Sequence, residues 1–195
     1  MKSLLSIHQD QPWLTHQILN DFRIEDVWLL PIKINETQKI GEVQNAFVEA
    51  MKDIGTRGTT GRLFQLRNWL GKIFHWEDDF DAVQNNTHGV LKQRYARHAK
   101  IQIDQLPVDG HKNFSLVYLT EEESLLEIEN KTVQAAIHFG KIKTEIDFNV
   151  QMVIFVKPKG LFGQLYMLAI KPFRHWIVYP TLLKTVAQQW KLKYA

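Results

Sequence analysis

The C-terminal part of the chain, from about Lys112 to Trp190, constrains the fold more than any other stretch. It contains short segments rich in β-branched and aromatic residues, followed by a long apolar run with helical spacing. We expect strands at residues 114–119, 125–130, 133–142 and 145–157. Links this short permit antiparallel pairing but no parallel crossover, so the sequence predicts an antiparallel meander closed by a C-terminal helix.

The expected C-terminal helix contains Pro172 and Pro180. Each proline lacks a backbone donor and crowds the preceding turn, so we expect kinks or a break rather than a straight rod. A kinked helix that lies across a curved sheet leaves space beneath it. The predicted architecture is therefore an α+β fold that can enclose a cavity.

The first half of the chain adds fewer elements. We expect a strand over residues 22–31 that ends at Pro31, and a helix over residues 40–54 that ends at Gly55. A second helix is predicted after Thr59 or Thr60, either of which can cap it, with Leu63, Leu66, Leu70 and Ile73 on one face. Weaker patterns indicate a short helix at 90–99 and a strand at 100–106, whereas residues 1–21 predict no element.

Composition and length fit one domain over residues 1–195, with 45% hydrophobic and 23% charged residues, as is usual for a soluble globular protein. There is no cysteine, which excludes disulfides and Cys-ligated zinc. The first residues lack the apolar run of a secretory signal, and no uninterrupted apolar stretch is long enough to span a bilayer. The sequence therefore predicts a cytoplasmic protein.

Charge is unevenly distributed along the chain. The net charge is +3, yet no acidic residue follows Asp147. The basic residues after that position are Lys157, Lys159, Lys171, Arg174, Lys184, Lys191 and Lys193. A basic helix beside a net acidic body could face an anionic membrane or a nucleic acid, and the simpler interpretation is a solvated outer helix face.

Three sequence blocks carry a resemblance to a known family. They are RLFQLRNWLGKIFHW (62–76), VYLTEEESLLEIENKTV (117–133) and GLFGQLYMLAIKPFRHWIVYP (160–180). The last fits a pattern Y-M-x-x-I-x-P-F-R-x-x-I-V-x-P. The chain thus resembles a bacterial family of uncharacterised proteins whose members sometimes follow an NAD(P)-binding domain of short-chain-dehydrogenase type.

The element order also resembles the helix-grip fold of the START-like and pollen-allergen-like superfamily, in which a curved antiparallel sheet wraps around a long C-terminal helix. The resemblance implies a cavity protein, with an NAD(P)-binding redox protein as a candidate partner. No G-x-G-x-x-G fingerprint follows a strand here, so a dinucleotide-binding domain is not expected within this chain and no cofactor is predicted.

Few residues stand out as chemical groups. Glu127 and Glu129 share one strand face and could form an acid–base pair, although an exposed acidic face is the simpler interpretation. His138 could face the cavity, although a buried, hydrogen-bonded histidine is more common. Arg174 could bind a ligand carboxylate, or pair with Glu129 across the fold, and a structural ion pair is the favoured role.

Our leading hypothesis is a binding module that encloses a small apolar or amphipathic ligand between the sheet and the C-terminal helix. The predicted ligand-binding residues are Tyr118, Glu129, His138, Tyr166 and Arg174. One alternative is an enzyme, or an accessory domain of an oxidoreductase, with Glu129 or His138 as general base. Another is a module that docks its basic C-terminal helix on a membrane or a partner. The sequence contains no recognisable nucleic-acid-binding module.

Overall fold

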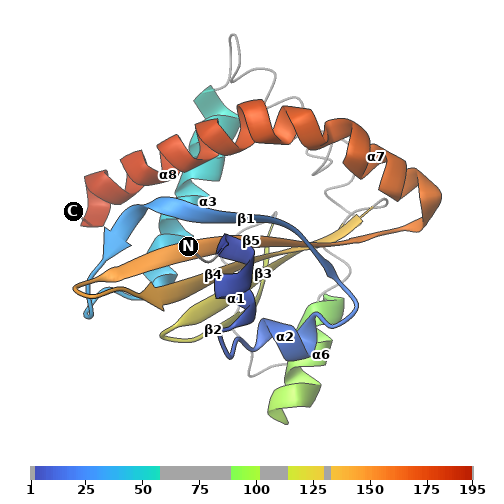
Figure 1. Ribbon diagram of the computed structural model, residues 1–195, viewed down its shortest axis with the longest axis horizontal. Helices are drawn as coiled ribbons and strands as arrows, with labels where there is room; N and C mark the ends of the chain where they lie inside the picture. Colours follow the sequence, from blue (N-terminus) through green and yellow to red (C-terminus); the bar gives the residue numbers. More distant parts are fainter. Residues whose placement is uncertain (1–2, 58–88, 102–113, 130–132, 195) are drawn as a thin grey trace.

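The computed structural model describes residues 3–57, 89–101, 114–129 and 133–194 (Figure 1). Five strands form one sheet: β1 (Arg23–Ile34), β2 (Ser115–Leu119), β3 (Glu123–Glu129), β4 (Val133–Lys143) and β5 (Phe148–Pro158). The described helices are α1 (Leu4–Gln9), α2 (Thr15–Ile18), α3 (Ile40–Arg57), α6 (Val90–Ala99), α7 (Gly160–Phe173), the π-helix η2 (Arg174–Val178) and α8 (Tyr179–Tyr194).

The sheet has the order β1-β5-β4-β3-β2, and every neighbouring pair is antiparallel. The predicted meander is therefore confirmed over β2 to β5. β1 comes much earlier in the chain and adds to the meander beside its last strand. The sheet is curved and a long C-terminal helix lies across it, which confirms the predicted α+β architecture (Figure 1).

Helices cover both faces of this sheet. On one face, α3 and α8 pack against Ile137 and Phe139 of β4 and form the larger hydrophobic core. On the other face, α2 and α6 pack against Ala136 and neighbouring side chains, and α1 lies beside them (Figure 1). Side chains alternate along a strand. Odd-numbered residues of β4 therefore face the C-terminal helix, and even-numbered residues face α1, α2 and α6.

Two predicted boundaries were wrong. β1 does not end at Pro31 but continues to Ile34. The pairing of β1 with β5 is irregular between Leu29 and Lys33, and β1 is an edge strand, so a proline without a backbone donor is tolerated there. The helix over residues 40–54 is confirmed, but it runs through Gly55 to Arg57.

The N-terminal residues, which predicted no element, form the short helices α1 and α2. The predicted short helix at 90–99 is confirmed as α6. The predicted second helix, which carries Leu63 to Ile73, lies outside the described residues, and so does all but the start of the predicted strand at 100–106.

The C-terminal helix continues through both prolines by widening rather than by breaking. Between Pro172 and Pro180 it makes one π turn, in which the N–H of Tyr179 donates to the carbonyl of Arg174 five residues back. The extra residue changes which side chains face the sheet. As a result Arg174, Val178 and Tyr179 are all buried on the inner side.

Gly140 lets the side chain of Trp13 pack closely against the backbone of β4. A Cβ at this position would lie 2.8 Å from Cζ2 of Trp13 and 2.9 Å from Cε1 of His138. We expect Gly140→Ala to lower the free energy of unfolding by about 1–3 kcal/mol, because the buried indole must move. Gly41→Ala is the matched control, since its Cβ would meet only the end of the Leu119 side chain and alanine favours the helix. Urea unfolding of both variants tests this, and equal stabilities would contradict it.

Candidate functional site

A buried ionic cluster joins β1 to the π turn of the C-terminal helix. Its acidic members are the consecutive residues Glu25 and Asp26 of β1. Successive strand residues normally face opposite sides, but the pairing of β1 with β5 is irregular between Ile24 and Asp26. Both carboxylates consequently reach Arg174 of η2.

Arg174 is the centre of the cluster. Its Nη2 donates to Oε1 of Glu25 at 2.5 Å, and its Nη1 lies 3.6 Å from Oδ2 of Asp26. The hydroxyl of Tyr179 donates to the same Oδ2 at 2.6 Å. A second cation, the exposed Arg23, lies 3.2 Å from the other oxygen of Glu25. The predicted structural ion pair of Arg174 is therefore present, but its partners are Glu25 and Asp26 rather than Glu129.

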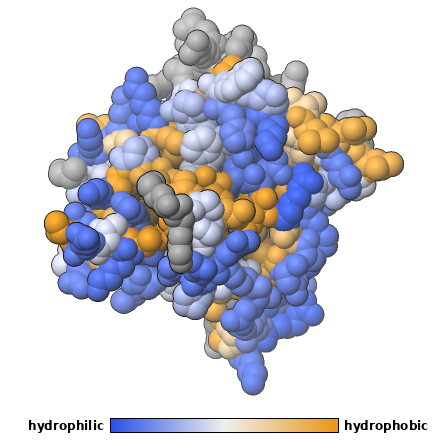
Figure 2. Space-filling view, viewed as in Figure 1, coloured by the Kyte–Doolittle hydropathy of each residue, from blue (hydrophilic) through white to orange (hydrophobic). Residues whose placement is uncertain are grey.

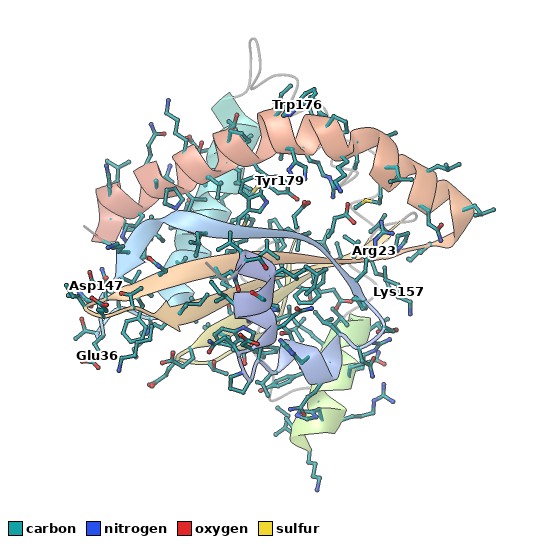
Figure 3. All side chains as sticks on the ribbon, viewed as in Figure 1. Arg23, Glu36, Asp147, Lys157, Trp176 and Tyr179 are labelled. Atoms are coloured by element: carbon teal, nitrogen blue, oxygen red, sulfur yellow. The ribbon has the colours of Figure 1, made fainter. Side chains whose placement is uncertain are left out.

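Burial fixes the protonation of the tyrosine. Burial, reinforced by the neighbouring carboxylate of Asp26, raises the pKa of Tyr179 well above its usual range. The phenol therefore stays protonated and remains a hydrogen-bond donor at physiological pH. Figure 3 shows Tyr179 directed toward the sheet, whereas Trp176 on the same helix points away from it.

Several nitrogen atoms of this region have no aligned acceptor among the described residues. They are Nε of Arg174, Nε1 of Trp28 and Nε2 of His175. The histidine nitrogen lies 2.8 Å from Oδ1 of Asp26, close enough for an ion pair but not aligned as a hydrogen bond. Its side chain is 35% exposed, so solvent reaches part of the imidazole. Unpaired buried donors are costly, so a bound group that supplied the acceptors would be stabilising here.

A small apolar cluster lies beside these polar groups, under α7. Val133, Val156 and Met167 form its buried part. Ala135, Ile154 and Ile170 pack against it and are only half-buried. Its buried members differ from those of the larger core under α3 and α8, and Ile154 packs against both clusters. The region under α7 therefore combines apolar side chains with hydrogen-bond donors at one end.

The opposite face of the sheet contains a second buried polar cluster. Glu123 of β3 accepts hydrogen bonds from the Tyr118 hydroxyl at 2.7 Å and from the backbone N–H of Leu14 at 2.9 Å. Nε2 of His138 lies 3.0 Å from the same carboxylate. Burial alone would raise the pKa of Glu123, but the hydrogen bonds from His138, Leu14 and Tyr118 lower it below its usual value.

His8 of α1 lies next to this second cluster. Its ring lies 5.3 Å from the ring of His138 and 5.2 Å from that of His16, and its Nδ1 lies 3.2 Å from Oε1 of Gln151. Burial, with the two neighbouring histidines, lowers the pKa of His8 to about 4. Burial likewise lowers the pKa of His138. Nowhere in the described part of the chain are three or more His, Cys, Asp or Glu residues placed to hold a metal ion.

Three of the five predicted ligand-binding residues can be placed, and they lie on two different faces of the sheet. Arg174 lies on the face under the C-terminal helix. Tyr118 and His138 lie on the other face, fully buried beneath the N-terminal helices. Of the remaining two, only the backbone is described: Glu129 pairs with Gln134 at the end of β3, and Tyr166 lies in α7. The predicted set does not form one site.

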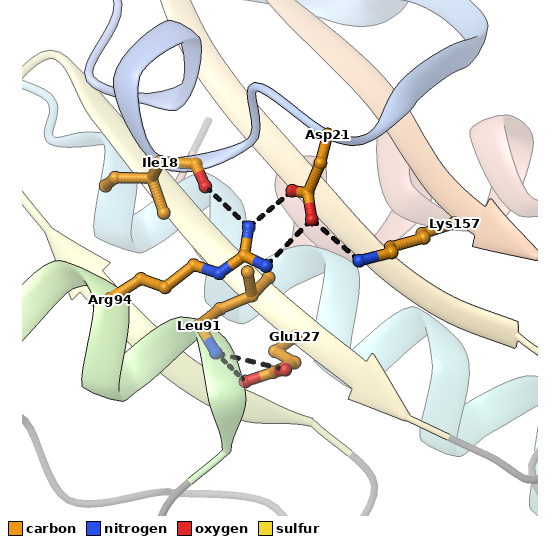
Figure 4. Close-up of polar contacts among 6 residues, drawn as sticks. All are labelled: Ile18, Asp21, Leu91, Arg94, Glu127 and Lys157. Atoms are coloured by element: carbon orange, nitrogen blue, oxygen red, sulfur yellow. Dashed lines mark hydrogen bonds and ion pairs between the residues drawn. The ribbon is translucent and has the colours of Figure 1, made fainter.

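The expected exposed acidic face was also wrong. Glu127 is buried, and its carboxylate accepts from the backbone N–H of Leu91 at the start of α6 (Figure 4). A carboxylate at a helix N-terminus is favoured by the unpaired N–H groups and the helix dipole. Glu127 therefore anchors α6 to the sheet.

A surface ion-pair network lies next to that anchor. Arg94 of α6 makes two contacts to the carboxylate of Asp21, to which Lys157 also donates at 2.7 Å (Figure 4). The hydrogen bond from Arg94 lowers the pKa of Asp21 well below its usual range. A surface pocket of about 380 Å³ beside this network is lined by Gln17, Ile18, Asn20, Arg94, Arg97 and His98.

Sequence reasoning missed Glu25, Asp26, His175 and Tyr179. A usable signal was the pair of adjacent acidic residues inside the apolar strand FRIEDVWLLP, because a buried carboxylate requires a partner. The basic, aromatic segment FRHWIVY of the C-terminal helix offers such partners.

Comparison with known families gives a match. A family described as "Protein of unknown function (DUF2867)" matches residues 18–181. The chain belongs to the DUF2867 family. The expectation of an uncharacterised family is thereby confirmed. The DUF2867 match includes every residue of the ionic cluster on β1 and the π turn, whereas His8 and α1 precede it. No curated protein and no solved structure matches the chain.

Proposed function

We propose that this DUF2867 protein binds a small amphipathic ligand between the sheet and α7. The apolar part of the ligand rests against the half-buried Ala135, Ile154 and Ile170. Its polar group accepts hydrogen bonds from Trp28 and His175. The helix-grip resemblance supports this placement, because a ligand between sheet and C-terminal helix is what that fold implies.

The observation that carries the proposal is the set of nitrogen donors without aligned acceptors beside an incompletely covered apolar cluster. A packed core with no ligand is expected to pair its buried donors and to cover its apolar side chains. The neighbouring ion pair of Arg174 with Glu25 and Asp26 holds this end of the site in place, since all three side chains are largely buried.

The resemblance to proteins that follow an NAD(P)-binding domain supports a redox protein as the partner that supplies or consumes the ligand. The absence of cysteine is compatible with the reducing cytoplasm, where we place this function. The ligand class is the first thing to establish. Mass spectrometry of the freshly purified protein, under native and then denaturing conditions, is expected to reveal a mass that is lost on denaturation.

A matched pair of variants locates the site. Ile170→Trp adds bulk at the proposed site beneath α7, whereas Leu168→Trp adds the same bulk on the outer side of the same helix, where Leu168 is 64% exposed. The probe is 1-anilinonaphthalene-8-sulfonate, which has an apolar body and an anionic group. We expect the affinity of the protein for this probe to fall by about tenfold or more in Ile170→Trp and to stay unchanged in Leu168→Trp. The indole of Ile170→Trp would occupy the apolar site that the probe needs.

Thermal unfolding of both variants checks that the fold is retained. Equal probe affinity in the wild type and Ile170→Trp would contradict the proposed site. A purified protein that carries no extra mass and does not bind the probe would contradict the proposed function.

A further inference from the structure

The outer face of α7 carries a line of exposed apolar side chains. Leu161 is 78% exposed, Leu165 65%, Leu168 64%, and Trp176, just beyond α7, 78%. With the exposed Pro172 these positions are spaced four, three, four and four residues apart, which places them along one side of a helix. We call these five residues the α7 stripe.

This stripe is separate from the inner side of the same helix. Met167 and Arg174 face the sheet and are buried, so the hydrophobic clusters of the described residues do not include the stripe. Figure 2 shows apolar side chains gathered at the α7 end of the molecule, and Figure 3 shows Trp176 pointing outward. A contiguous exposed apolar surface of this kind marks an interaction site.

The charged residues within α7 and just before it are all positive. Lys159 precedes the helix and Lys171 lies within it, and both are exposed. No acidic residue follows Asp147, so neither α7 nor α8 contains one. Leucine and tryptophan on one side of a helix, with lysines beside them, are the composition of helices that lie in the interface of an anionic membrane.

We propose that the α7 stripe docks this protein on an anionic lipid bilayer. The leucines and Trp176 enter the boundary between headgroups and acyl chains, while Lys159 and Lys171 contact lipid phosphates. No helix of the described ranges is long and apolar enough to cross a membrane, so α7 lies along the surface. This inference does not rest on the proposed ligand site.

Charge favours a bilayer over a second copy of the chain. If two copies joined through this face, the lysines beside one stripe would lie near those beside the other. Like charges across an interface are unfavourable. A lipid surface supplies the opposite charge and needs no complementary shape. The anionic bilayer is therefore the occupant that matches both the apolar line and its flanking charges.

The test is flotation with lipid vesicles. The full chain is mixed with vesicles of phosphatidylcholine, or of phosphatidylcholine with about 30% phosphatidylserine, the anionic lipid of cytoplasmic leaflets. We expect the protein to float with the anionic vesicles, and binding to fall as salt is raised. The double variant Leu165→Gln/Leu168→Gln is expected to bind the anionic vesicles with an affinity lower by about tenfold or more, because it removes apolar area from the stripe.

Leu192→Gln is the matched control. Leu192 is 82% exposed on α8 and lies outside the stripe, so its replacement should leave vesicle binding unchanged. Urea unfolding shows whether all variants fold equally well. A wild type that does not float, or an equal loss of binding in Leu192→Gln, would overturn the proposal. Light scattering distinguishes the remaining outcome: a dimer that the double variant dissociates, without vesicle binding, would assign the stripe to self-association instead.

Discussion

Arg174→Ala is expected to lower the free energy of unfolding by about 3–5 kcal/mol, the usual cost of removing one partner of a buried ion pair. The side chains of Arg174 and Asp26 are only 5% and 4% exposed. Without the guanidinium, Glu25 keeps its contact to the exposed Arg23, and Asp26 stays buried with only Tyr179 and His175 beside it among the described residues. Urea unfolding at neutral pH measures the change.

Arg94→Ala is the matched control, because it also removes an arginine that contacts an aspartate. Arg94 and Asp21 are 25% and 36% exposed, so water compensates much of the loss. Exposed pairs of this kind contribute about 0–1 kcal/mol. Equal melting temperatures of Arg174→Ala and Arg94→Ala would contradict a structural role for the buried pair.

Acidification is expected to destabilise the protein through the histidine cluster. His8 has a folded-state pKa of about 4, against 6.5 for an ordinary histidine. Between these values the unfolded chain binds a proton that the folded chain excludes, so stability falls as the pH drops from 6.5 to 4. The loss from His8 alone is about 3 kcal/mol when complete. The lowered pKa values of His138 and Glu123 act in the same direction.

The measurement is the free energy of unfolding at several pH values between 7.5 and 4.5. His8→Phe keeps an aromatic ring beside Trp13 and Phe155 but cannot titrate, so its stability should depend less on pH than that of the wild type. His98→Asn, on the exposed surface of α6, is the control. Identical pH profiles for the wild type and His8→Phe would show that His8 does not contribute.

The meander and α3 could be predicted because their signals are local. Strands joined by a few residues must pair as antiparallel neighbours, and the apolar spacing of Val43, Phe47 and Met51 specifies one helix face. The position of β1 could not be predicted in the same way. Its pairing with β5 joins residues that are far apart in the chain, and nothing local indicates it.

The N-terminal helices were missed for a related reason. α1 and α2 are too short to form through helix propensity. Contacts to distant strands hold them: His8 meets Gln151, and the Leu14 N–H donates to Glu123. Such tertiary contacts leave no periodic pattern in the sequence.

The assignment of side chains to faces failed where both faces of the sheet are buried. Ile137, His138 and Phe139 are successive buried residues, so polar–apolar alternation does not distinguish the two sides. His138 was therefore assigned to the C-terminal helix side. The burial of Arg174 was predictable from its apolar neighbours, but its partners were not, because the irregular pairing of β1 redirects Glu25 and Asp26.

The place of β1 in the sheet has a consequence for biosynthesis. This strand is made early, yet among the described strands it pairs only with β5, near the end of the chain. On the ribosome the apolar residues of β1 must stay unpaired until the whole meander has emerged. Such non-local pairing is slow to form and leaves a strand open to aggregation. In a nascent chain truncated before β5, β1 is therefore a candidate binding segment for chaperones.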